Sequence, residues 1–392
     1  MKHSLENNIL TLFPEGRIDS GNAEKTEAEI NSVIAENPSE NLILDVEALQ
    51  YLSSAGLRVV LRLRKKFSGM KIINASPEVY DIFDMTGFTE MIQIEKAYRR
   101  LSVEGCEVIG QGANGKVYRL DPDTIIKVYL NPDALPDIHR ERELARKAFV
   151  LGIPTAIPYD VVKVGQGYGS VFELLNAKSF AKLIIADTAN VDKCVEMSVE
   201  LLKKIHSTEV KPGDMPDMKE VALNWASFLG DYLPREDFEK LYALIDAVPH
   251  CDNMLHGDYH IKNVMLQNGE VLLIDMDTLC VGDPVFEFAS VWLAYQGYSS
   301  LDHEVVKGFL GIPYEVTTKI WNDTLRLYFG TDDEEVLRSY EDKAKVIGYT
   351  RMMRRTIRRK GFETEEGRAL IEHCKASLAA LLPEIDSLSF NK

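Results

Sequence analysis

The sequence predicts two domains, an α/β layer domain at residues 1–98 and an α+β domain at residues 102–392. In the first hundred residues, short apolar runs typical of strands alternate with longer helical stretches, and this alternation indicates an α/β layer structure. From residue 102 the rhythm changes, because several strand-like segments come first and mostly helical segments follow. Strands that are grouped apart from helices indicate an α+β domain.

The first region is expected to alternate strands and helices. Its first helix starts near Asp19 or Ser20, which are residue types that cap helices, and it carries acids in its first turns. A basic segment without hydrophobic pattern, residues 95–105, marks the expected boundary between the domains. The expected strands are 8–16, 41–46, 69–75 and 91–94, and the expected helices are 19–37, 54–67 and 77–87.

The second region opens with segments that can pair as antiparallel strands. Residues 106–120 and 124–130 form the first such pair, and residues 161–175 hold two more strands. A helix is expected between them, at 136–152. Beyond Asn176 the pattern is mostly helical, interrupted by residues 255–266 and by the apolar strand at 269–277.

Composition limits the possible classes of protein. The chain is 45% hydrophobic and 27% charged, as expected of a protein that buries cores, and its formal net charge of −16 argues against nucleic-acid binding. Five dispersed cysteines without a CxxC pair favour a reducing compartment. Because there is neither a signal-peptide core nor an apolar run of roughly 20 residues, we expect a cytoplasmic protein without membrane contact.

A glycine-rich segment suggests phosphate binding. Gly110, Gly112 and Gly115 have GxGxxG spacing, and glycines let backbone N–H groups approach an anion closely. Because they lie between two strands, the segment is typical of a hairpin that covers phosphates and not of a dinucleotide-binding turn. Lys127 follows on an apolar strand, where a charge needs a partner. We expect that partner to be Glu143 on the next helix, with Glu141 the less favoured alternative.

The segment "LHGDYHIKNVML" carries the chemistry. Asp258 is placed to accept a proton from a substrate hydroxyl during phosphoryl transfer, and Asn263, five residues later, is placed to hold a metal ion. Asp275, at the end of an apolar strand, is expected to hold the same metal. An amide and a carboxylate suit Mg²⁺, which takes its other ligands from phosphates and water. His256 and Gly257 are expected to serve the structure of the turn.

Residues 102–390 resemble the aminoglycoside phosphotransferase and choline kinase-like family, relatives of protein kinases. "HGDYHIKNVML" is similar to the family's HGDxHxxN loop, and "LIDMDTLCVGDPVFEFA" to its second conserved segment. The resemblance implies a two-lobed protein kinase-like fold with ATP between an N-lobe at 102–175 and a C-lobe at 176–392. It also implies that Lys127 binds the α- and β-phosphates with Glu143 as its partner, that Asp258 is the catalytic base, and that Asn263 and Asp275 bind Mg²⁺.

The same resemblance implies an adenine site and shows two departures. In "SVFELLN", Phe172 would border the adenine pocket, and the backbone of Glu173 to Leu175 would hydrogen-bond the base. Ile261 and Lys262 replace a common Pro-Gly pair, and Lys262 is either a phosphate or substrate contact or a solvated surface residue. An acid is retained as Glu287 where relatives have Asp, so we expect a structural role there. Asp277 is a weaker candidate for a further metal or substrate ligand.

Residues 1–96 resemble the STAS domain of anti-sigma-factor antagonists, through "GRIDSGNA", "LILDVEALQYLSSAGLRVVLRL" and "NASPEVYDIFDMTGFTEMIQI". The resemblance implies a mixed sheet with flanking helices and a role in protein–protein regulation. In phosphoregulated members, the position of Ser54 accepts a phosphate. Ser53 or Ser54 can equally cap the following helix, and because Ser53 stands where regulated members often have Asp, we favour the cap.

A stripe of arginines lies near the C-terminal end. Thr331 and Glu334 fit a capping box that starts a long helix. The arginines at its far end can bind an anionic substrate or a phosphorylated partner, or dock onto the acidic STAS domain. They can also simply complement the helix dipole, which is the reading we favour. If the stripe faces the active site, a polycationic aminoglycoside is a poor substrate. The i, i+3, i+4, i+7, i+8 spacing places on one face Arg351, Arg354, Arg355, Arg358 and Arg359.

The sequence therefore predicts an ATP- and Mg²⁺-dependent phosphotransferase that acts on a hydroxyl of a small-molecule acceptor, with a STAS domain for regulation or for docking a protein partner. Two alternatives stay open. One is a Ser-directed, protein kinase-like enzyme, and the other is a catalytically silent nucleotide-binding scaffold. The joint presence of Lys127, Glu143, Asp258, Asn263 and Asp275 argues against the scaffold.

Overall fold

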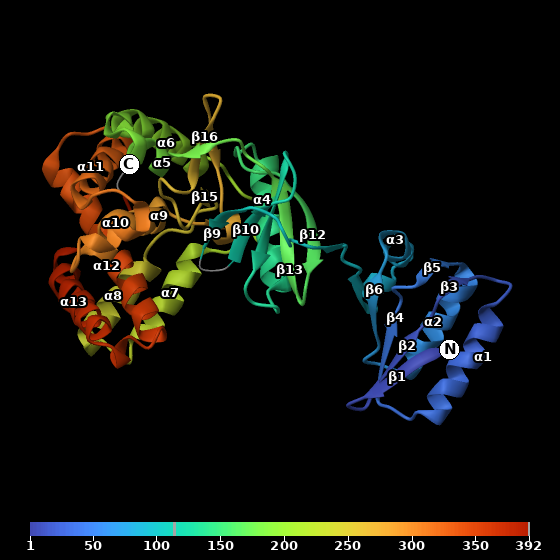
Figure 1. Ribbon diagram of the computed structural model, residues 1–392. Coiled ribbons are helices and arrows are strands. Elements are labelled where there is room, and N and C mark those ends of the chain that lie inside the picture. Colours follow the sequence, from blue (N-terminus) through green and yellow to red (C-terminus); the bar gives the residue numbers. More distant parts are fainter. Residues whose placement is uncertain (113–114, 391–392) are drawn as a thin grey trace. The chain divides into compact units, whose positions relative to one another are not determined.

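The computed structural model describes residues 1–112 and 115–390 (Figure 1). The chain divides into two compact units. The first comprises Met1–Ser102 with Val161–Gly165, and the second comprises the rest. Each unit has a separate cluster of buried apolar side chains, so each has its own hydrophobic core.

The first unit is an α/β layer structure with a mixed five-stranded sheet of order β1-β2-β4-β6-β7. β1 and β2 pair antiparallel, and the other neighbours pair in parallel. The predicted α/β fold with a mixed sheet and flanking helices is confirmed. The elements are β1 Lys2–Glu6, β2 Ile9–Phe13, β3 Gly16–Ile18, α1 Ala23–Glu36, β4 Asn41–Asp45, β5 Leu49–Leu52, α2 Ser54–Lys66, β6 Lys71–Ala75, α3 Pro77–Met85, the 3₁₀ turn η1 Phe88–Glu90 and β7 Gln93–Lys96.

The start of α2 settles which serine caps this helix. The Ser53 side chain accepts a hydrogen bond from the Ala55 N–H at 3.2 Å, so Ser53 is the N-cap. Ser54 is the first residue of the helix, and it is exposed. The Ser54 hydroxyl therefore does not cap this helix.

The second unit begins with a sheet whose strands run in the order β12-β13-β11-β10-β9, with helix α4 following β11. The pairs β9–β10, β10–β11 and β11–β13 are antiparallel. The short strand β8, Arg100–Leu101, pairs with Lys163 and Val164 at the end of β12, in the part of β12 that belongs to the first unit. The bounds are β9 Val108–Gln111, β10 Gly115–Arg119, β11 Thr124–Tyr129, α4 Leu135–Val150, β12 Pro158–Val164 and β13 Gly167–Glu173.

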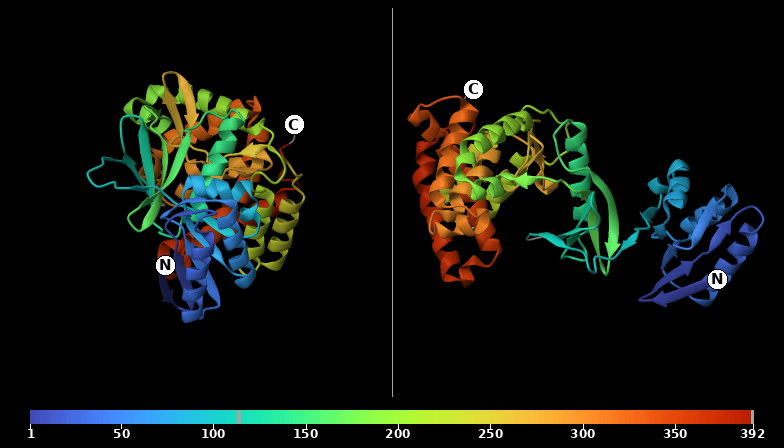
Figure 2. Two further views of the ribbon diagram at one scale, coloured as in Figure 1. Left: turned by 90° about the vertical axis from the view of Figure 1, so that its right-hand side faces the viewer. Right: turned by 45° about the horizontal axis from the view of Figure 1, so that its top comes forward.

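The remainder of the second unit is mainly helical, as predicted (Figure 2). Two small sheets, β14-β16-β17 and β15-β18, carry the segments that interrupt the helices. Their bounds are β14 Lys178–Ser179, β15 Met254–Leu255, β16 Val264–Gln267, β17 Glu270–Leu273 and β18 Cys280–Val281. The helices are α5 Phe180–Ala186, α6 Val191–His206, α7 Met218–Leu229, α8 Arg235–Asp246, α9 Pro284–Tyr295, α10 Glu304–Leu310, α11 Tyr314–Phe329, α12 Glu334–Arg358 and α13 Glu365–Leu381, with 3₁₀ turns η2 Thr188–Asn190, η3 Met276–Thr278, η4 Gly297–Ser299, η5 Gly361–Glu363 and η6 Leu382–Glu384.

Helix α9 is the centre of this helical part. Every residue from Val285 to Tyr295 is buried, and the helix packs against α11 and α12. Helix α12 starts differently from the prediction: its N-cap is Asp333, which accepts from the N–H groups of Glu335 and Val336, so the expected capping box of Thr331 and Glu334 is wrong.

Candidate active site

The loop that contains Asp258 is held in place by a buried carboxylate. Glu287 on α9 accepts hydrogen bonds from the backbone N–H groups of His256 and Gly257, the latter at 3.0 Å. The His256 ring lies 3.2 Å from the Ile274 carbonyl oxygen, and the Thr278 hydroxyl donates to the His256 carbonyl at 2.7 Å. These contacts fit the structural roles that we predicted for His256 and Glu287.

Gly257 makes the turn possible. Its φ of +79° lies in the left-handed region, which residues other than glycine rarely adopt. A Cβ atom at this position would also lie 2.5 Å from the Thr278 carbonyl oxygen. Both constraints require glycine, and they bring the next residue, Asp258, to the tip of the turn.

Glu287 is ionised in spite of its burial. Burial would raise the pKa of its carboxyl, but the nearby His206, the His256 side chain and the bonds to the loop backbone lower the pKa below the ordinary value. The His206 ring nitrogen lies 3.8 Å from the Glu287 carboxylate. The charge under the loop is therefore compensated by directed donors.

The Asp258 carboxylate is also held in its ionised form. Burial opposes the charge, but the side chain of His260, 3.6 Å away, and the guanidinium of Arg351 lower the pKa of Asp258 to about 2. A carboxylate of this kind orients a substrate hydroxyl by accepting its hydrogen bond. It takes up the hydroxyl proton only when the hydroxyl oxygen becomes less basic, as that oxygen bonds to phosphorus.

Asn263 is fixed in the same loop. Its Nδ2 donates to the Asp258 carbonyl oxygen at 3.0 Å, which leaves Oδ1 as the side-chain atom for a ligand. The Asn263 carbonyl accepts from the N–H of Ile274 at 3.0 Å, so the loop is tied to the chain just before Asp275. Asp275 itself has a left-handed backbone, with φ of +65°.

Lys127 joins the sheet to this loop region. Its Nζ lies 2.8 Å from Glu141 Oε1 and 3.1 Å from Asp275 Oδ1. Tyr129 also donates its hydroxyl proton to Glu141, at 2.5 Å. Burial would lower the pKa of Lys127, but the carboxylates of Glu141 and Asp275 outweigh it and raise the pKa above its ordinary value. Lys127 is therefore a permanent cation beside Asp275.

The pairing of Lys127 with Glu143 that we predicted is wrong. The Glu143 side chain is 56% exposed and lies 4.0 Å from Arg146, whereas that of Glu141 is 5% exposed. The reason is the phase of α4: its buried face includes Ile138, Glu141 and Leu144, and a residue two positions after Glu141 points about 200° away on a helix of 3.6 residues per turn.

Negative charge accumulates around this point. Burial and the carboxylates of Asp275, Glu141 and Asp258 raise the pKa of Asp277 to about 7, and Lys127 opposes them only in part. Lys127 contacts Glu141 and Asp275 and also acts on Asp277, so three carboxyl groups lie around this one lysine, with Asp258 nearby. Among the described residues no group of three His, Cys, Asp or Glu side chains has the arrangement of a complete metal site. An amide oxygen, a half-exposed carboxylate and excess negative charge nevertheless fit Mg²⁺, which needs few protein ligands when phosphates supply the rest.

The glycine segment lies beside Lys127. Gly112 donates its N–H to the Gly115 carbonyl at 3.0 Å across the β9–β10 turn, and the two residues between them lie outside the described range. Gly110 pairs with Val117 in the hairpin. A Cβ at Gly115 would lie 2.4 Å from the Val128 carbonyl oxygen, so Gly115 allows β10 to approach the strand that carries Lys127.

The segment predicted to bind adenine follows β13. Phe172 is 9% exposed near the end of this strand. The N–H of Glu173 donates to the Ile157 carbonyl at 3.1 Å, and the N–H of Leu174 donates to the Asp123 carbonyl at 2.7 Å. Among the described residues, the N–H of Leu175 has no backbone carbonyl partner. This amide is therefore the one that can donate a hydrogen bond to a nucleotide base.

Two residues of this site were not expected to be its main contributors. Glu141 was the less favoured partner of Lys127, and Arg351 belonged to the arginine stripe for which we favoured the dipole reading. Arg351 comes from α12 and donates to the Gly257 carbonyl at 3.1 Å and to the Ser290 hydroxyl at 3.0 Å. The regular spacing of the arginines predicted that they share one face of the helix. It did not predict which residues that face contacts.

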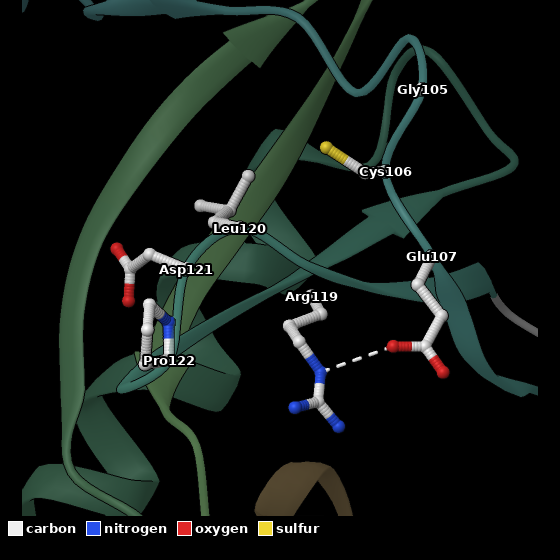
Figure 3. Close-up of a pocket in the computed structure, with 7 residues that line it drawn as sticks. All are labelled: Gly105, Cys106, Glu107, Arg119, Leu120, Asp121 and Pro122. Atoms are coloured by element: carbon white, nitrogen blue, oxygen red, sulfur yellow. Dashed lines mark ion pairs between the residues drawn. The ribbon is translucent and has the colours of Figure 1, made fainter.

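A separate pocket of about 450 Å³ lies between the segment just before β9 and the turn that joins β10 to β11 (Figure 3). Arg119 and Glu107, which form an ion pair of 3.2 Å, line it together with Cys106 and Asp121. None of its lining residues belongs to the Asp258 loop or the Lys127 cluster. The candidate site is therefore defined by its contacts and not by this pocket.

Within the described residues, no helix combines the length and the apolar character needed to cross a membrane.

Two protein families match this chain. The family model for the phosphotransferase enzyme family matches residues 105–313, and that for the STAS domain matches residues 4–101. BtrV of Bordetella bronchiseptica, described as an anti-sigma factor antagonist, is 33% identical over 84 residues, which are 20% of this chain and 72% of that protein. An anti-sigma F factor antagonist of Paenibacillus polymyxa is 24% identical over 90 residues, which are 22% of this chain and 77% of that protein.

Solved structures resemble the second unit. The apo form of a thermostable mutant of aminoglycoside phosphotransferase APH(4)-Ia has a TM-score of 0.50 and 11% identity, covering 72% of this chain and 97% of that chain. A variant of that protein in a ternary complex with ADP and hygromycin B also has a TM-score of 0.50 and 11% identity, covering 79% of this chain and 98% of that chain. At this identity the likeness shows the fold, and it confirms the predicted kinase-like architecture.

Proposed function

This chain belongs to the phosphotransferase enzyme family and carries a STAS domain before the family's domain, and from this we propose that it transfers the γ-phosphoryl group of ATP to a hydroxyl of a small-molecule acceptor. The observation that carries the proposal is the contact of Lys127 with both Glu141 and Asp275. This contact joins the strand with the phosphate-binding lysine to the segment beside the Asp258 loop.

The nucleotide end of the proposed site uses charge and backbone groups. Lys127, oriented by Glu141, binds the α- and β-phosphates, and the N–H groups of the Gly110–Gly115 hairpin cover them. At the adenine, the carbonyl of Glu173 and the N–H of Leu175 form the hydrogen bonds, with Phe172 against the base. The internal bonds of the Glu173 and Leu174 amides support this choice.

At the other end, Asp258 orients the acceptor hydroxyl. A new bond forms between the acceptor oxygen and the γ-phosphorus, the bond from that phosphorus to the β–γ bridging oxygen breaks, and the hydroxyl proton passes to the Asp258 carboxylate. Asn263 and Asp275 would hold Mg²⁺, which supplies positive charge against the phosphate oxygens when bound. Lys127 contributes a further positive charge near the same oxygens.

The STAS domain is proposed to dock a protein partner or to regulate the enzyme. The anti-sigma factor antagonists that match it support this role. Ser54 is a candidate regulatory phosphosite, because it is exposed at the start of α2 and a phosphate is stabilised at a helix N-terminus.

The exposure of Ser54 also favours a second candidate function, a protein kinase-like transfer to a serine of another copy or of a STAS partner. ATP labelled at the γ-position distinguishes the two functions. Label that stays on protein and is lost in the Ser54→Ala variant supports the second function. Label that leaves with a small molecule supports the first.

The proposal is tested by ATP consumption with Mg²⁺ against a panel of hydroxylated metabolites and aminoglycosides. We expect at least one acceptor to stimulate turnover in the wild type and none to do so in Asp258→Ala, which should bind nucleotide as tightly as the wild type. Stimulated turnover at the wild-type rate in Asp258→Ala would show that Asp258 is not the base.

A further inference from the structure

Four arginines on one side of α12, namely Arg351, Arg354, Arg355 and Arg358, are called here the arginine face. Among the described residues, none of the four has a carboxylate oxygen within 4.0 Å. Acids are available, since Lys360 just beyond the helix pairs with Glu363 at 3.7 Å. In a chain of net charge −16, four adjacent arginines without a counter-ion need an explanation.

The helix dipole explains only part of the arginine face. Dipole effects act within the last turn of a helix, and α12 ends at Arg358. Arg351 lies seven positions earlier, and its guanidinium is used by the Asp258 loop instead: it donates to the Gly257 carbonyl and the Ser290 hydroxyl. It also contributes to the lowered pKa of Asp258. One end of the arginine face therefore lies at the proposed acceptor hydroxyl.

In the described part of the chain, the partners of Arg355 and Arg354 are neutral side chains. Arg355 donates to the Tyr298 hydroxyl at 2.7 Å, and its guanidinium carbon lies 5.3 Å from that ring's centroid. Arg354 lies over Phe228 at 5.8 Å, and its Nε is buried without a hydrogen-bond partner. Burial and the repulsion from Arg358 lower the pKa of Arg354. Among the described residues, Arg354 and Arg355 thus carry neighbouring positive charges without a carboxylate partner, and Arg358 repels Arg354.

The spacing suits a single small ligand. Arg351 and Arg355 are four residues apart on the helix, which corresponds to an axial rise of about 6 Å. A ligand whose hydroxyl is at Asp258 can therefore reach Arg355 with a group a few bonds away. Guanidinium groups that stack on aromatic rings keep their N–H edges for a carboxylate or phosphate, which they bind by paired hydrogen bonds.

We propose that the phosphoryl acceptor carries an anionic group, a carboxylate or a phosphate ester, which binds to Arg355 and Arg354 while its hydroxyl lies at Asp258. This inference rests on the proposed function and adds the charge class of its substrate. It excludes polycationic acceptors, since an ammonium group at this position would face at least three guanidinium groups.

The test is a binding titration that needs no turnover. The protein is saturated with Mg²⁺ and the non-hydrolysable analogue AMP-PNP, so that added anions cannot occupy the nucleotide site. Four three-carbon compounds are then added: glycerol 3-phosphate, glycerate, glycerol and 2-amino-1,3-propanediol. The signal is the fluorescence of Trp225, whose ring lies 5.6 Å from the Arg351 guanidinium, and Trp225→Phe assigns the signal to this residue.

Two substitutions on the same helix form a matched pair. Arg355→Gln removes a charge of the arginine face, and Arg338→Gln removes an exposed charge at the opposite end of α12. We expect glycerol 3-phosphate or glycerate, but neither glycerol nor the amine, to give a saturating change. Arg355→Gln should weaken that binding at least tenfold, Arg338→Gln should leave it unchanged, and Arg355→Lys should restore part of it. The two anions distinguish a phosphate from a carboxylate site.

Binding of the amine instead of the anions, equal anion binding in wild type and Arg355→Gln, or the absence of any response to the anions would each overturn the inference. None of these outcomes depends on catalysis. If the anions bind as expected but no acceptor is phosphorylated in an Asp258-dependent way, the proposed function fails and the anion site remains.

Discussion

At the scale of single residues, two glutamates of α4 provide a direct test of the Lys127 site. Glu141 contacts Lys127 and Tyr129, whereas Glu143 is exposed on the other side of the same helix. Glu141→Gln should lower kcat/KM for ATP about a hundredfold, because it would misplace Lys127, the proposed phosphate-binding group, and a misplaced group costs roughly that much. Glu143→Gln should change kcat/KM less than twofold. Equal losses in the two variants, measured by steady-state kinetics, would contradict the assigned pairing.

Glu287 gives a prediction about pH and stability. Its pKa in the folded protein lies below the ordinary 4.5, so its ionised form stabilises the fold above pH 4.5, and this stabilisation is lost as the pH falls through the lowered pKa. Glu287→Gln removes a buried charge that has directed partners. It should lower the free energy of unfolding by on the order of 3 kcal/mol at pH 7, and by less below pH 4.5.

Urea unfolding of the wild type and Glu287→Gln at pH 7 and at pH 4 measures the loss of free energy of unfolding at each pH, provided that the wild type stays folded at pH 4. Glu372→Gln, an exposed position on α13, is the control and should change neither. A deficit for Glu287→Gln that is the same at both pH values would show that the charge of Glu287 does not contribute as described.

The residues also show how far sequence reasoning reaches. The order of Lys127, Asp258, Asn263 and Asp275 along the chain led us to predict that they share one site. The structure places Lys127 Nζ 3.1 Å from Asp275 Oδ1 and Asn263 in the Asp258 loop, and the roles of these residues in phosphoryl transfer stay predictions. Which glutamate meets Lys127 depends on the rotational phase of α4, and this phase is set by packing against the rest of the unit. Arg351 and Gly257 lie 94 positions apart, and local periodicity carries no information about such a contact.

At the scale of elements, a comparison of two glycine turns separates the effect of close packing from that of backbone strain. Gly257 and Gly269 both have positive φ, of 79° and 87°, so alanine strains the backbone equally at each. A Cβ at Gly257 would lie 2.5 Å from Thr278 O, whereas a Cβ at Gly269 meets nothing within 4 Å. Gly269→Ala should therefore cost about 1 kcal/mol of stability.

Gly257→Ala should cost at least twice as much and should also abolish phosphoryl transfer, because the turn positions Asp258. Thermal unfolding and turnover of the two variants provide the comparison. Similar melting temperatures for both would mean that the loop can move away from Thr278.

Elements with a clear hydrophobic pattern were predictable, and polar ones were not. β2 and β4 bury alternate apolar residues, β6 buries Ile72 and Ala75, and all three lie within predicted strands. β1 was missed because it is a mostly exposed edge strand, with no buried face to produce an alternating pattern. The predicted strand at 8–16 ends at Phe13, just before Pro14.

At the scale of the whole molecule, the two separate cores predict independent unfolding. Calorimetry should show two transitions, because each unit buries its own apolar cluster. Mg²⁺ with AMP-PNP should raise the melting temperature of one transition only, since a ligand stabilises the unit that binds it. A single transition that shifts as a whole with nucleotide would show that the units unfold cooperatively.

We propose that Asp258 directs the γ-phosphoryl group of ATP to a hydroxyl. The decisive experiment is to detect a phosphorylated acceptor by mass spectrometry after incubation with Mg²⁺-ATP and a mixture of hydroxylated carboxylates and phosphate esters. We expect a product with one added phosphoryl group from the wild type, and at least a hundredfold less from Asp258→Ala. The same amount of product from both proteins, or tight ATP binding with no phosphorylated hydroxyl compound of any charge, would contradict it.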